Sequence, residues 1–106
     1  MPKFLIQAAY TGEGLRGIMK DTASGRRAAV TRMIEGAGAR VESFHYSLGD
    51  HDAVLIVDAP DNVTGAALSL AASASGVVRT STTALLTVEE MDEAIAKSVD
   101  YAPPGS

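Results

Sequence analysis

The stretch from His45 to Asp58, HYSLGDHDAVLIVD, constrains the fold of this chain more than any other feature. Gly49-Asp50 separates two β-prone runs, and a Gly-Asp pair favours the positive backbone angles of a tight hairpin turn. The continuous apolar run at 53–57 is typical of a strand covered on both faces. The sequence therefore predicts a hairpin whose second strand enters the core and ends at Asp58.

A two-residue turn also fixes which residues of the hairpin lie opposite each other. The expected pairs are Leu48 with His51, Ser47 with Asp52, Tyr46 with Ala53, and His45 with Val54. The first hairpin strand, residues 40–48, alternates between rings at Phe44 and Tyr46 and small polar residues on its other face. One face of that strand is therefore expected to be wet.

Two further strands are expected around the hairpin, together with a first helical crossover in two pieces and two single helices. The strands are residues 3–10 and the polar, β-branched run 77–86, which is suited to a sheet edge. A first crossover has a short helical piece with Leu15, Ile18 and Met19, a loop at 21–25, and a longer helix stopped by Gly36 and Gly38. Asp61 caps a second helix that Ser75-Gly76 closes, and Thr87 with Glu90 forms a capping box for a third, residues 88–98.

Apolar spacing predicts which sides of the last two helices face the core. The second helix carries a stripe of small residues, namely Val63, Ala66, Ala67, Leu70, Ala71 and Ala74. The last helix is expected to turn Val88, Met91 and Ile95 inward.

The order of elements matches a split βαβ plan, so we expect an α+β, ferredoxin-like βαββαβ sandwich with an extra C-terminal helix. Residues 1–98 would form the domain, and 99–106 an extended tail. With all helices on one side, Leu5, Ala9, Val54 and Ile56 or their alternates leave the other sheet face too apolar for water. A homo-oligomer, at least a dimer through the open sheet face, is the expected solution.

Composition excludes several functional classes. The 106 residues suit one domain, and a net charge of −4 argues against nucleic-acid binding, with Arg26-Arg27 interpreted as a solvated helix start. The absence of cysteine removes thiolate chemistry and cysteine-based metal sites. No signal peptide and no membrane-spanning run is evident, so we expect a cytoplasmic protein without membrane association.

Three segments resemble the GYD-domain family: residues 1–11, MPKFLIQAAYT; residues 44–52, FHYSLGDHD; and residues 74–87, ASGVVRTSTTALLT. The resemblance covers nearly the whole chain. It implies a dimeric α/β barrel, in which two ferredoxin-like sheets face each other, and no established activity. The family's Gly-Tyr-Asp signature falls on the turn at 49–52, where this chain has His51 in the aromatic position.

Three functional hypotheses follow. His45, His51 and Asp52, with Asp50 nearby, suggest a metal site, although a two-residue turn points the two histidines to opposite faces. A small cofactor-independent enzyme, oxygenase-like or isomerase-like, would use Tyr10, His45, Asp52 and Arg79 around a pocket. The preferred hypothesis needs fewer features of the sequence. It is a homo-oligomeric assembly or small-ligand-binding module, with no cofactor.

Overall fold

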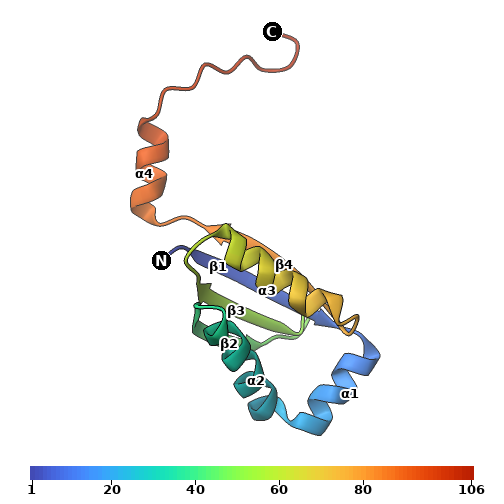
Figure 1. Cartoon of the computed structure of the whole chain (residues 1–106). Helices are drawn as coiled ribbons and strands as arrows, with labels where there is room; N and C mark the ends of the chain where they lie inside the picture. Colours follow the sequence, from blue (N-terminus) through green and yellow to red (C-terminus); the bar gives the residue numbers. More distant parts are fainter.

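Four antiparallel strands form a single sheet in the order β2-β3-β1-β4 in the computed structural model, which describes residues 1–106 (Figure 1). The strands are β1 (Lys3–Tyr10), β2 (Arg40–Tyr46), β3 (Ala53–Asp58) and β4 (Val78–Leu85). The two most apolar strands, β1 and β3, occupy the centre, and the polar β4 lies at an edge as predicted. This order and direction of the strands confirm the ferredoxin-like α+β fold.

Four helices accompany the sheet: α1 (Gly12–Asp21), α2 (Ala23–Gly36), α3 (Asn62–Ala74) and α4 (Val88–Ala96). The core lies between the sheet and the helices α2 and α3, which supply Ile34 and Leu68. The strands contribute the alternate residues Phe4, Ile6, Ala8, Ala53, Leu55, Val57 and Val78. Every second residue of these strands packs into this core. The intervening residues therefore point to the opposite face of the sheet, which neither α2 nor α3 covers.

The helix boundaries follow the predicted caps. The Asp61 side chain accepts a 2.8 Å hydrogen bond from the backbone N–H of Thr64, and Gly76 follows α3 with a φ of 78°. Thr87 and Glu90 form the reciprocal bonds of a capping box at the start of α4. The expected loop at 21–25 is wrong, since only Thr22 interrupts α1 and α2; its side chain accepts from the N–H of Gly25 and starts α2 at once.

The hairpin has the predicted pairs His45 with Val54 and Tyr46 with Ala53, but its turn differs from the prediction. Strand β2 ends at Tyr46, before Leu48, and only Gly49 of the two turn residues has a positive φ. The hydroxyl of Ser47 donates to the carbonyl of His51, and the N–H of Asp52 donates to Ala8 on β1. The N–H of Ser47 also donates to the carbonyl of Asp52 at 2.8 Å, so the predicted pair of Ser47 with Asp52 is bonded beyond the end of β2, and the bond from Asp52 to Ala8 ties the turn to β1.

The simple alternation predicted for β2 is also wrong. A β-bulge between Val41 and Ser43 breaks the register with β3. Val41 therefore packs on the core beside Phe44, and Ser43 lies opposite Ile56 on the other face.

The predicted inward stripe of α3 is wrong. Gly65 and Leu68 are the buried residues of this helix, and Leu70 of the predicted stripe is 71% exposed against 5% for Leu68. Gly65 lets the helix approach β1 so closely that an added Cβ would lie 3.3 Å from the Phe4 ring. No charged residue occurs in α3, so its apolar spacing alone does not single out one face.

The expected inward face of α4 is wrong as well. Val88, Met91 and Ile95 are 76%, 47% and 74% exposed, and no residue of the helix is buried. Figure 1 shows α4 and the C-terminal segment leading away from the sheet. The Cα radius of gyration is accordingly 16.9 Å, whereas a compact chain of this length would have about 13 Å. None of the four helices combines the length and the apolar composition that a membrane-spanning helix needs.

Candidate functional site

A cavity of about 70 Å³ lies between α2, α3 and the core face of the sheet. Eleven of its 14 lining residues are hydrophobic. Helix α2 contributes Arg26, Val30, Met33 and Ile34, helix α3 contributes Leu68, Ser69 and Ala72, and the strands contribute Ile6, Ala8, Tyr10, Phe44, Leu55, Val78 and Thr80. The two helices lie over opposite edges of the sheet, on β2 and β4, and the cavity is the space between them.

Some polar side chains of this cavity have a partner within the chain, and Arg26 has no ion-pair partner. The hydroxyls of Ser69 and Thr80 lie 2.8 Å apart in a hydrogen bond. The guanidinium of Arg26 takes part in none of the ion pairs of the chain, which all involve Lys3 or Arg40. Arg26 is therefore the one charged group on the cavity wall, and it has no counter-ion within the chain.

Two aromatic residues of β2 lie beside the N-terminal part of α2. Tyr46 donates a 2.9 Å hydrogen bond from its hydroxyl to the carbonyl of Ala23, and its ring centroid is 5.3 Å from that of Phe44. Burial raises the pKa of the Tyr46 hydroxyl, and the charges of Arg26 and Arg27 act in the opposite direction. The first turn of α2 is therefore a locally cationic region in an acidic protein.

The structure brings Asp52 to Tyr10 but separates these two residues of the enzyme hypothesis from His45 and Arg79. Tyr10 lines the cavity on the core face. His45 and Arg79 are exposed and lie opposite Val54 and Ala9, on the other face of the sheet and on its two outer strands. The carboxylate of Asp52 accepts a 2.8 Å hydrogen bond from the N–H of Tyr10, which ties the hairpin turn to the end of β1.

The metal hypothesis finds no cluster in the structure. No group of three or more histidine, aspartate and glutamate side chains has an arrangement that could hold a metal ion. His45 lies on a strand and His51 in the turn, and the carboxylate of Asp52 is engaged by the backbone of β1.

The open face of the sheet is the second candidate site. Leu5 and Ile56 lie opposite each other on the central strands, and Val54 lies next to them opposite Gln7. All four side chains are half-buried by their neighbours, and no helix contributes to this face. The predicted apolar strip of Leu5, Ala9, Val54 and Ile56 thus occupies the uncovered side.

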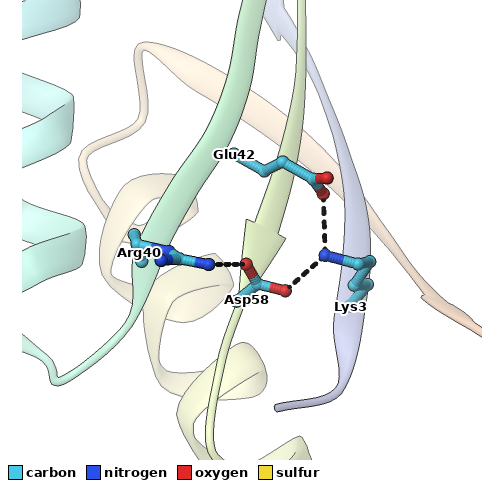
Figure 2. A network of polar contacts seen from close by, with 4 residues as sticks. All are labelled: Lys3, Arg40, Glu42 and Asp58. Carbon is cyan, nitrogen blue, oxygen red and sulfur yellow. Dashed lines mark hydrogen bonds and ion pairs between the residues drawn. The ribbon is translucent and has the colours of Figure 1, made fainter.

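A network of ion pairs lies at one end of this open face, where β1 and β3 pair at Lys3 and Asp58 (Figure 2). The Asp58 carboxylate accepts from Lys3 Nζ at 2.8 Å and from Arg40 Nη2 at 3.1 Å, and Lys3 also bonds to Glu42 at 2.9 Å. Asp58 is 3% exposed. Its two cationic partners lower its pKa, the Lys3 hydrogen bond more than that of Arg40.

A family model described as the GYD domain matches residues 4–95. The chain belongs to the GYD-domain family. The match extends from β1 into α4 and therefore includes both the cavity and the open sheet face. No curated protein and no solved structure shows significant similarity to this GYD-domain chain.

Sequence reasoning missed the ionic network and the position of Arg26. If the hairpin pairing continued without a bulge, Ala59 would lie opposite Arg40, whereas the bulge brings Asp58 there. A carboxylate at the end of an apolar strand was the available signal for a paired charge. The side of α2 that carries Arg26 is set by tertiary packing, and no local signal distinguishes it from the exposed Arg27.

Proposed function

We propose that this GYD-domain protein is a self-associating module in which two copies bury their open sheet faces against each other. The observation that carries the proposal is the strip of Leu5, Val54 and Ile56 on the two central strands, on the side without helices. Soluble monomers rarely leave a continuous apolar surface on a central part of a sheet. A second copy covers such a strip by twofold symmetry without any further partner.

The surroundings of the strip fit an interface of this kind. The outer strands supply polar residues, among them Ser43 and His45 on β2 and Ser81 and Thr83 on β4. Protein interfaces commonly combine an apolar centre with a polar rim. The network around Asp58 lies at one end of the strip. Because Lys3 and Arg40 pair with the Asp58 carboxylate, an interface there would not bury an unpaired charge.

Sedimentation velocity over a range of protein concentrations tests the proposal. The wild-type chain is expected to sediment as a dimer or a larger assembly at micromolar concentration. Ile56→Glu would place a carboxylate in the middle of the strip and is expected to produce monomers, because an unpaired charge is costly to bury. The matched control is Leu70→Glu on the outer side of α3, which is expected to retain the assembly.

Two outcomes would contradict the proposal. One is a wild-type chain that stays monomeric at high micromolar concentration. The other is an assembly that survives Ile56→Glu but dissociates in Leu70→Glu, since the contact would then involve the helical side. Circular dichroism of each variant establishes that its fold is retained.

A second function, binding of a small molecule, is supported by the cavity between α2, α3 and the sheet. Its walls are mainly apolar, and a largely apolar cavity with few polar groups is the usual form of a small-ligand site. A thermal shift on addition of a small aromatic compound would support this function. The control is Ala72→Leu, which fills the cavity from α3 and is expected to abolish the shift.

A further inference from the structure

The cavity between α2, α3 and the sheet has mainly apolar walls and one charged side chain, Arg26. We infer that it binds a small monoanion with an apolar body and one carboxylate, and that Arg26 pairs with that carboxylate. The inference rests on the proposed small-molecule binding and adds to it the ligand class and the residue that selects it.

Arg26 is the one charged residue on the cavity wall. Arg26 is partly buried on α2 and lines an otherwise apolar space. The carboxylates of α1 and α2, on Glu13, Asp21 and Glu35, form no ion pair with it. An arginine that lines an apolar cavity without a counter-ion favours binding of an anion, and its planar N–H groups match a carboxylate.

The remaining polar groups restrict where that anion can lie. Ser69 and Thr80, on the α3 side, are bonded to each other. The hydroxyl of Tyr10 forms no hydrogen bond within the chain, and Tyr10 lines the same cavity as Arg26. The polar end of the ligand therefore belongs at Arg26 and Tyr10, and its apolar body lies against Leu68, Ala72 and Val78.

Size and charge together define the ligand class. A cavity of about 70 Å³ is small, so it restricts the body of the ligand to a short chain or a single ring. A dianion would leave its second charge without a partner in an apolar space, which is costly. Small aromatic or short-chain carboxylates satisfy both conditions.

The experiment compares benzoate with benzamide, which has nearly the same shape and no charge. Both are titrated into the full-length protein by isothermal calorimetry at neutral pH and low salt. Benzoate is expected to bind about tenfold more tightly, which corresponds to about 1.4 kcal/mol. Arg26→Gln is expected to weaken the binding of benzoate about tenfold and so to remove this preference.

The matched control is Arg32→Gln, which removes the same charge from an exposed position of the same helix. It is expected to retain the preference for benzoate, because Arg32 does not line the cavity. This control separates local pairing at Arg26 from a general effect of the net charge of the protein. Circular dichroism before each titration shows that the variant is folded.

Equal affinities of the wild-type protein for benzoate and benzamide would overturn the anion preference but leave cavity binding intact. Failure of both compounds to bind would overturn small-molecule binding itself, and the inference with it. A preference for benzoate that survives Arg26→Gln or disappears in Arg32→Gln would overturn the assignment of Arg26.

Discussion

Asp58 and Lys3 lie opposite each other at the paired ends of β3 and β1, where Lys3 Nζ donates a 2.8 Å hydrogen bond to Asp58 Oδ1. The pKa of Asp58 is lowered from its ordinary value of 3.8, first by this bond and then by the bond from Arg40. A carboxyl whose pKa is lower in the folded state stabilises the fold above its unfolded pKa. That stabilisation is lost as the pH falls through the folded pKa.

We therefore expect the network to weaken in acid. Asp58→Asn should lower the melting temperature at neutral pH, and the difference from the wild-type protein should shrink as the pH falls from about 4 toward 2. Calorimetric melting curves across this range provide the measurement. Asp50→Asn, at an exposed turn residue outside any side-chain hydrogen bond, is the control. A difference that stays constant down to about pH 2 would contradict the role of the ionised carboxylate.

The same network predicts a loss of stability in alkali. The hydrogen bond to Asp58, followed by that to Glu42, raises the pKa of Lys3 above its ordinary 10.5. A lysine with a raised pKa stabilises the fold below its unfolded pKa, and this contribution disappears as the pH rises through the folded pKa. Lys3→Met should therefore lower the melting temperature near pH 9 and have less effect above about pH 11. An effect that grows with rising pH would argue against this assignment.

Two threonines on the core face of β4 differ in their partners. Thr82, opposite Ile6, has a buried hydroxyl without a hydrogen bond, whereas the hydroxyl of Thr80 bonds to Ser69 and Ser73. Thr82→Val should raise the free energy of unfolding by about 1 kcal/mol, because valine has the same shape and no unsatisfied hydroxyl. Thr80→Val should lower it by about 1 kcal/mol. Urea denaturation measures both, and equal effects of the two substitutions would contradict the difference.

Gly14 and Gly17 lie on the same helix, α1, in different surroundings. A Cβ on Gly14 would overlap the carbonyl oxygen of Val77 and lie 3.0 Å from the Tyr10 ring, whereas a Cβ on Gly17 would meet nothing within 4 Å. Gly14→Ala should destabilise the fold by about 1–3 kcal/mol through overpacking. Gly17→Ala should stabilise it by up to about 1 kcal/mol through helix propensity. Thermal unfolding of both variants checks the prediction, which fails if Gly14→Ala is neutral.

The orientation of α3 can be tested with two leucines. Leu68 faces the core and Leu70 faces outward. Leu68→Ala should lower the free energy of unfolding by about 2–5 kcal/mol by leaving a cavity, and Leu70→Ala should change it by less than about 0.5 kcal/mol. A larger loss for Leu70 than for Leu68, measured by urea denaturation of the same preparations, would restore the stripe predicted from the sequence.

Much of the sheet could be predicted because local signals agreed with each other. The apolar run of β3 has the length of a strand, and the pairing of His45 with Val54 follows from the short turn at Gly49. The caps at Asp61 and Thr87 were also predictable, since each side chain bonds to an N–H three residues away. Contacts that close within one turn leave a signature in the sequence.

The face of α3 and the position of Arg26 could not be predicted in the same way. Helix α3 is apolar on several sides, so the side that packs depends on where Gly65 can approach Phe4. The bulge in β2 gives no local signal, yet it decides that Arg40 lies opposite Asp58. These features depend on elements that are distant in the sequence.

The sequence by itself determined the order of the strands and helices, the caps at Asp61 and Thr87, the central position of β1 and β3, and the apolar character of both sheet faces. Only the tertiary structure decided which side of α3 is buried, how the bulge aligns the charges around Asp58, and that Arg26 lines a cavity. The physical reason is that capping and strand alternation depend on neighbouring residues, whereas packing depends on the shapes of surfaces that meet only after folding.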